Sequence, residues 1–144
     1  MKKFAAIQMT SGPEVAPNLA AAETLLAAAA VAGAGLVALP ENFALMARSD
    51  AERLGVAEDD GRGPIQEFLA AAARRHKLWL VGGTLPLKTI QPKKVRAACL
   101  LFDDQGRRVA RYDKMHLFDV TLSNGEQYRE SVVFEPGTEV VVAD

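Results

Sequence analysis

The sequence predicts an α/β fold in which a mixed β-sheet carries helices on one face. Apolar strand patterns alternate with helical patterns over residues 3–81, which is typical of crossovers between parallel strands. Farther along, two strand patterns are separated only by Asp103–Gly106, a turn sequence that joins antiparallel strands. Parallel crossovers followed by a hairpin predict a sheet of mixed direction.

The first crossover joins a strand at Lys3–Met9 to a strand at Leu36–Leu39 through an alanine-rich helix. Asn18 has a side chain suited to cap that helix, and leucine and alanine recur after it at helical spacing. Pro40 lacks a backbone N–H and cannot extend a ladder, so the second strand ends there. Glu41 is therefore expected at the carboxyl end of a buried strand, where open α/β sheets bind ligands.

The remaining elements follow from turn residues and hydrophobic spacing. Gly63-Pro64 opens the second long helix, because proline suits a first helical turn. In chain order we expect a short helix around Ser49–Leu54, a helix at Ile65–His76, a strand at Leu78–Val81, a polar loop at Lys88–Lys94, strands at Val95–Phe102 and Arg107–Tyr112, mostly loop over Asp113–Pro136, and a strand at Val140–Val142.

Composition limits the possible functions. The 144 residues suit one domain, and 49% hydrophobic with 24% charged residues is ordinary for a globular protein. A formal net charge of -1 gives no general attraction to nucleic acid or to an anionic membrane, so we expect neither as a partner. One cysteine cannot build an intrachain disulfide framework, so a reducing cytoplasmic location is the simplest expectation.

No cofactor or metal site is predicted. Gly82-Gly83-Thr84 follows a strand but lacks the further glycines and the lysine of a phosphate-binding loop, so a turn or a close backbone approach explains it better. His76 and His116 do not have the spacing of zinc ligands.

Two charged residues at strand ends are candidates for chemistry. A carboxylate at the position of Glu41 would be partly desolvated, which suits it to act as a general base. Lys114 comes just after a predicted strand, and a lysine near such a carboxylate stays charged and can stabilise a developing oxyanion. Taken separately, each is better explained as a solvated surface residue.

Several motifs together resemble the nitrilase superfamily of carbon–nitrogen hydrolases, and most of all its Nit branch, which includes ω-amidase and deaminated glutathione amidase. The resemblance runs from Phe4 to the end of the chain and rests on Leu39-Pro40-Glu41-Asn42-Phe43, Tyr112-Asp113-Lys114-Met115-His116-Leu117-Phe118-Asp119, Tyr128-Arg129-Glu130-Ser131 and Phe134-Glu135-Pro136-Gly137. It implies a four-layer α-β-β-α sandwich, of which residues 1–144 would form a single partial domain, the N-terminal half.

The resemblance also implies catalytic roles. Glu41 takes the role of general base, Lys114 that of oxyanion stabiliser, and Glu130 matches a second glutamate that positions lysine and substrate. In that family a cysteine attacks an amide or nitrile carbon, and water then releases the acid. The family cysteine lies beyond the Pro-Gly motif, and this chain ends at Asp144 before such a residue.

Cys99, the only cysteine of the chain, lies in an apolar strand pattern, where neither access nor a lowered thiol pKa is expected. We therefore expect an amidase half that is inactive by itself, belonging to an enzyme for a small non-peptide amide, one that bears a carboxylate. A homo-oligomer assembled through the sandwich is expected. Two alternatives stay open: a non-catalytic interaction or self-association module, and a flavodoxin-like ligand binder, which the hairpin disfavours.

Overall fold

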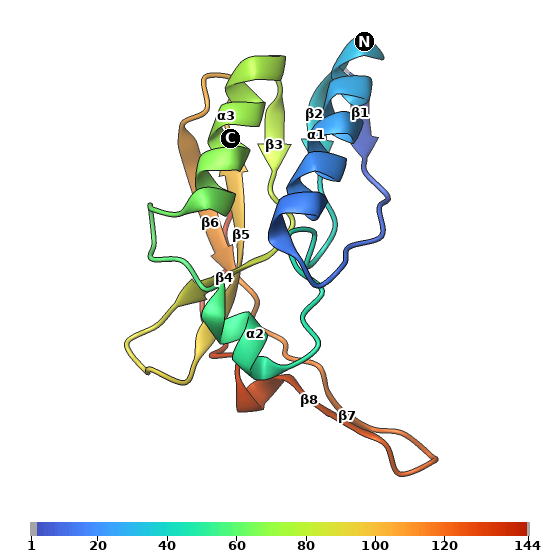
Figure 1. Ribbon diagram of the computed structural model, residues 1–144. Helices are drawn as coiled ribbons and strands as arrows, with labels where there is room; N and C mark the ends of the chain where they lie inside the picture. Colours follow the sequence, from blue (N-terminus) through green and yellow to red (C-terminus); the bar gives the residue numbers. More distant parts are fainter. Residues whose placement is uncertain (1–2, 144) are drawn as a thin grey trace.

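The computed structural model describes residues 3–143 (Figure 1). No helix in that range has the length and hydropathy required to cross a membrane. The elements in chain order are β1 (Lys3–Ala6), α1 (Val15–Val31), β2 (Ala34–Ala38), α2 (Asp50–Gly55), α3 (Pro64–His76), β3 (Trp79–Val81), β4 (Leu85–Lys88), β5 (Val95–Phe102), β6 (Arg108–Asp113), β7 (Asp119–Thr121), β8 (Gln127–Arg129) and the 3₁₀ turn η1 (Glu130–Val132).

The main sheet is mixed, as predicted. β1, β2 and β3 are parallel neighbours, and β5 runs antiparallel to β3. β4 pairs with the first half of β5, and β6 pairs with β5 as its antiparallel hairpin partner. Because two reversals separate β3 from β6, the strands β2, β3 and β6 all run in the same direction.

Both long helices cover the same face of this sheet, which confirms the predicted arrangement (Figure 1). Leu26 of α1 and Leu69 of α3 are fully buried against strand residues such as Val37 and Leu80. Glu23 of α1 accepts a hydrogen bond from Arg75 of α3, so an ion pair also links the two helices.

The opposite face of the sheet is partly open. Side chains alternate along a strand, so the neighbours of the buried core residues point away from the helices. Leu36, Trp79, Val81 and Leu101 are only partly buried and line a hollow of about 580 Å³. Phe4, whose side chain is also found there, remains 72% exposed.

The predicted cap at Asn18 is wrong. α1 begins three residues earlier, at Val15, and Pro17 lies in its first turn, where a missing N–H has no cost. Asn18 is instead buried inside the helix. Its side chain exchanges two hydrogen bonds of 2.8 Å with the backbone of Gly12 and donates a third, of 2.9 Å, to the carbonyl of Ala44.

Three strand predictions also need correction. β4 was missed because it contains Pro86, which is tolerated here because β4 lies at an edge of the sheet. The segment predicted as mostly loop contains the β7–β8 hairpin, turned at Asn124-Gly125. Val140–Val142 forms no strand, since its valines pair with no strand among residues 3–143.

Candidate active site

The sheet brings Glu41 and Lys114 to the same end, where the carboxyl ends of β2 and β6 lie. Glu41 lies three residues after the end of β2, and Lys114 directly follows β6. Because β2 and β6 run in the same direction, their carboxyl ends meet at one end of the sheet. The Lys114 N–H donates to the carbonyl of Ala97 at 3.0 Å, which fixes the lysine backbone to β5.

Lys114 is held between two carboxylates. Its Nζ lies 2.9 Å from Glu41 Oε1 and 2.9 Å from Glu130 Oε2. Glu130 Oε2 also accepts a hydrogen bond of 2.7 Å from the N–H of Phe118, so the glutamate ties Lys114 to the loop that leads into β7. The structure thus brings together all three residues that the sequence singled out.

The electrostatics of the cluster keep the lysine charged. Burial alone would lower the pKa of the Lys114 ammonium, but the hydrogen bonds and ion pairs with Glu130 and Glu41 outweigh it and raise this pKa. An ammonium has three donors. Two of them serve the glutamates, so one is left to bind a ligand oxygen.

Glu41 is more exposed than expected. Half of its side chain, 51%, is accessible, against 22% for Lys114 and 24% for Glu130. The predicted desolvation of the Glu41 carboxylate is therefore only partial in residues 3–143. Burial of the Glu41 carboxylate would need a further surface placed over this edge of the sheet.

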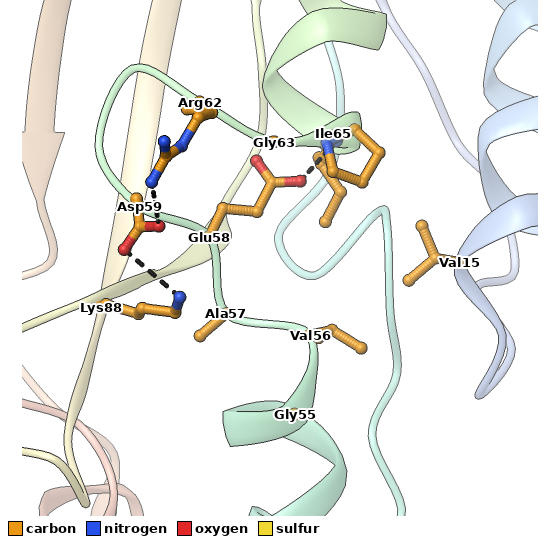
Figure 2. A pocket seen from close by; sticks show the side chains of 11 residues that line it. Val15, Gly55, Val56, Ala57, Glu58, Asp59, Arg62, Gly63, Ile65 and Lys88 are labelled. Carbon is orange, nitrogen blue, oxygen red and sulfur yellow. Dashed lines mark hydrogen bonds and ion pairs between the residues drawn. The ribbon is translucent and has the colours of Figure 1, made fainter.

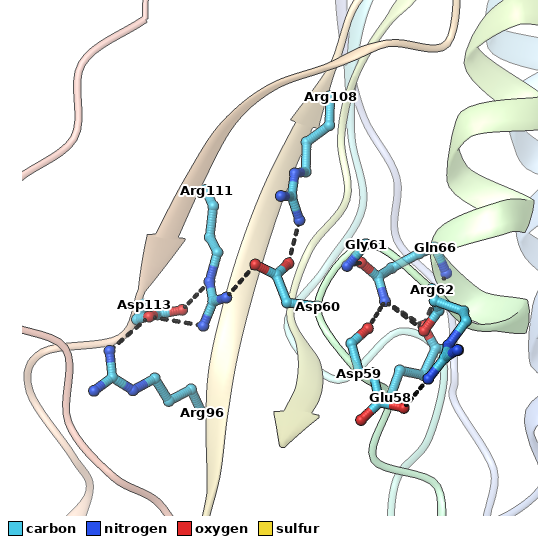
Figure 3. A network of polar contacts seen from close by, with 10 residues as sticks. All are labelled: Glu58, Asp59, Asp60, Gly61, Arg62, Gln66, Arg96, Arg108, Arg111 and Asp113. Carbon is cyan, nitrogen blue, oxygen red and sulfur yellow. Dashed lines mark hydrogen bonds and ion pairs between the residues drawn. The ribbon is translucent and has the colours of Figure 1, made fainter. Parts of the chain in front are cut away.

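An arginine network fixes the strand end that carries Lys114 (Figure 3). Asp113 accepts a 3.0 Å contact from Arg96 of β5 and one of 2.9 Å from Arg111 of its own strand. Arg111 and Arg108 also bind Asp60, which lies in the loop before α3. The network ties β5, β6 and that loop together, one residue away from Lys114.

The loop that carries Glu41 is anchored by residues that the sequence did not reveal. Phe43 is fully buried, and its carbonyl accepts a 2.9 Å hydrogen bond from the hydroxyl of Ser11. The Asn18 side chain holds Ala44 in the same way. Ser11 and Asn18 gave no signal of this role in the sequence, because their partners lie 26 to 32 positions away.

Cys99, the single cysteine of the chain, is only partly buried. It lies in the middle of β5, opposite Tyr112 of β6. Burial raises the pKa of its thiol, which disfavours the reactive thiolate. A packing role for Cys99 stays a prediction.

A separate pocket lies at the start of α3 (Figure 2). Its volume is about 380 Å³, and none of the three predicted site residues lines it. The carboxylate of buried Glu58 accepts hydrogen bonds from the N–H groups of Ile65 and Gln66, at 2.5 and 3.1 Å, and so satisfies the helix terminus itself. Within residues 3–143, no group of three or more His, Cys, Asp or Glu side chains is arranged to hold a metal ion.

Comparison with known proteins identifies the family. The sequence model described as carbon-nitrogen hydrolase matches residues 3–144. The chain belongs to the carbon-nitrogen hydrolase family. The predicted resemblance to the nitrilase superfamily is confirmed.

Relatives of the Nit branch match almost the whole chain. Deaminated glutathione amidase of Yersinia enterocolitica is 37% identical over 142 residues, which cover 97% of this chain and 49% of that protein. The ω-amidase NIT3 of Saccharomyces cerevisiae is 31% identical over 147 residues, covering 99% and 50%. This carbon-nitrogen hydrolase chain therefore spans about half the length of the curated relatives it matches.

The fold has a close counterpart among solved structures. The Caenorhabditis elegans NitFhit protein superposes with a TM-score of 0.85 at 29% identity, covering 96% of this chain and 34% of that one. Nit3 of Saccharomyces cerevisiae, a member of branch 10 of the nitrilase superfamily, gives a TM-score of 0.73 at 28% identity, covering 90% and 45%.

Proposed function

We propose that this chain supplies the glutamate–lysine–glutamate part of an amidase active site. The observation that carries this proposal is the Lys114 ammonium held 2.9 Å from both Glu41 and Glu130 at the carboxyl edge of the sheet. A carboxylate in contact with a fixed ammonium can accept a proton while the ammonium stabilises negative charge. Packing alone requires neither group.

In the proposed reaction, a cysteine thiol gives its proton to the Glu41 carboxylate, and the thiolate sulfur bonds to the amide carbon. The carbonyl π electrons move to oxygen, and the free donor of Lys114 stabilises this oxyanion. When the C–N bond breaks, the amine leaves with the proton held by Glu41. Water then attacks the thioester carbon while Glu41 takes one of its protons. The C–S bond breaks, the acid leaves, and the expelled thiolate takes the proton back from Glu41.

Burial raises the pKa of the Cys99 thiol, and Cys99 lies in mid-strand, so we propose that the nucleophile lies instead on a polypeptide outside these 144 residues, which form one half of the hydrolase domain. The substrate class we infer is a small non-peptide amide that bears a carboxylate, in keeping with the ω-amidase and deaminated glutathione amidase relatives. The chain alone is then inactive, because losing the nucleophile removes most of the rate enhancement.

The test measures ammonia released from the ω-amides of glutarate and succinate. The 144-residue chain should release none, whereas the chain combined with the cysteine-bearing polypeptide encoded downstream should do so. Glu41→Gln and Lys114→Gln should each abolish that turnover, and Glu52→Gln, on the exposed helix α2, should not. Turnover by the chain alone that disappears in Cys99→Ala would refute the proposal.

A second candidate is a self-association module, and the open face of the sheet favours it. Leu36, Trp79, Val81 and Leu101 lie side by side there and are only partly buried. Exposed apolar patches of this kind mark interaction surfaces. If this face joins two copies, Leu36→Asp should shift the chain to monomer in sedimentation velocity, whereas Ile90→Asp, at a position already 96% exposed, should not.

A further inference from the structure

The segment that joins β3 to β4, residues 82–84, lies directly against the loop that carries Glu41. The Leu39 N–H donates to the carbonyl of Val81 at 2.9 Å, so the chain leaving β2 still follows the end of β3. Beyond this point the two segments touch at two more places, one on each side of Glu41.

The first contact is between Gly83 and Pro40. A Cβ atom at Gly83 would lie 2.1 Å from the Pro40 carbonyl oxygen, so a side chain has no room. Gly83 also has φ +57°, a left-handed conformation that other residues adopt at a cost. A glycine here allows two backbones to lie in contact immediately before Glu41.

The second contact is between Thr84 and Asn42. The Thr84 hydroxyl oxygen accepts a 2.9 Å hydrogen bond from the N–H of Asn42. Asn42 has φ +56°, an uncommon conformation for a residue other than glycine, and it needs support from its surroundings. Ser11 and Asn18 hold the loop farther on, at Phe43 and Ala44, whereas Thr84 acts at the residue next to Glu41.

We propose that Gly83 and Thr84 are positioning residues that aim the Glu41 carboxylate at the Lys114 ammonium. The Thr84 hydroxyl and the Gly83 backbone both act on the backbone of Pro40–Asn42 and not on the carboxylate itself. Half of the Glu41 side chain is exposed, so its direction depends on that backbone and on the ion pair rather than on packing. The inference rests on the proposed function, in which Glu41 is the general base.

The variants separate positioning from folding. Thr84→Val keeps the shape of the side chain and removes the acceptor, whereas Thr84→Ser keeps the acceptor. Thr89→Val is the matched control, because the Thr89 hydroxyl serves an exposed loop, where it accepts from the N–H of Gln91. Glu41→Gln gives the reference state of a Lys114 that has lost the Glu41 carboxylate and keeps that of Glu130.

The readout is the ¹⁵N resonance of the Lys114 side-chain ammonium in the 144-residue chain. In Thr84→Val it should move toward the Glu41→Gln position and lose its slow hydrogen exchange, while Thr84→Ser and Thr89→Val keep the wild-type signal. A wild-type Lys114 signal in folded Thr84→Val would overturn the proposal. The readout does not involve amide hydrolysis, so this result and the failure of the amidase proposal are distinguishable.

A direct measurement keeps the test decisive if Thr84→Val does not fold. Amide hydrogen exchange of Asn42 in wild type and in Thr84→Ser should be slowed by about 100-fold relative to an unstructured peptide. Exchange of Asn42 at the unstructured rate in wild type would show that the hydroxyl does not hold this loop, and would overturn the proposal.

Discussion

Lys114 Nζ lies 2.9 Å from Glu41 Oε1, although the two residues are 73 positions apart in the sequence. The contact joins the ends of β2 and β6, between which β3 and β5 lie in the sheet. Glu130 completes the cluster from the 3₁₀ turn η1, which follows β8. The predictions below probe the cluster and the elements that hold it.

Removing the Lys114 charge should destabilise the chain only where the lysine is protonated. Its pKa is raised above the ordinary 10.5 in the folded state, so its stabilisation is complete below the unfolded pKa and is lost as pH rises through the folded one. Lys114→Gln should lower the free energy of unfolding by about 0.5–1 kcal/mol at pH 8. Urea unfolding should show this difference shrinking above pH ~10.5; an unchanged difference at pH ~11.5 would contradict the ion pairs.

Gly83→Ala should destabilise the fold by roughly 3 kcal/mol, the sum of left-handed strain and displacement of the Pro40 carbonyl. Gly55→Ala is the matched control, because a Cβ there meets nothing within 4 Å. Gly55 lies in α2, so its replacement should be neutral or stabilise by up to about 1 kcal/mol. Chemical denaturation of both variants measures the difference, and equal effects would argue against the close approach.

The thiol of Cys99 should react slowly in the folded chain. Burial raises its pKa, so the thiolate fraction near neutral pH is smaller than in a free cysteine. Labelling with iodoacetamide, followed by mass spectrometry, should be at least about 10-fold slower in buffer than in denaturant. Equal rates in the two conditions would mean that Cys99 is accessible and would make it a candidate nucleophile again.

Glu23→Gln should weaken the packing of α1 against α3, because it removes the charge that pairs with Arg75 and His76. Burial would raise the pKa of the Glu23 carboxyl, but hydrogen bonds from His76 and Arg75 outweigh it and lower this pKa below 4.5. The stabilisation is therefore present above pH ~4.5 and is lost as pH falls through the folded pKa. Thermal unfolding should show a loss of about 1 kcal/mol at pH 7 that disappears as pH falls through the folded pKa. Exposed Glu139→Gln, the control, should show neither effect.

Local patterns predicted most of the fold. Val95–Phe102 was placed correctly because a long apolar run bounded by turn residues has few alternatives. The missed elements depend on tertiary context. β4 contains a proline that only an edge position tolerates, and β7 and β8 have three residues each, too few to show an alternating pattern.

The sequence predicted the charged residues of the site, which belong to recognisable motifs. It did not predict the polar residues that hold the Glu41 loop in place. Glu41, Lys114 and Glu130 each belong to a stretch that resembles the family. The support from Ser11, Asn18 and Thr84 comes from single polar side chains bonding to backbone atoms far away in the sequence, and no local pattern marks such a partner. The exposure of Glu41 likewise depends on which surfaces surround it.

The separation of β2 from β6 has a consequence for the order of folding. Closing a flexible loop of 73 positions costs about 4 kcal/mol of chain entropy, more than a partly exposed ion pair returns. The Glu41–Lys114 contact therefore forms after the strands between them have paired. Substitutions of Glu41 or Lys114 should therefore leave the refolding rate almost unchanged and accelerate unfolding instead. It follows that the side chains at these two positions can change without slowing the folding of the sheet.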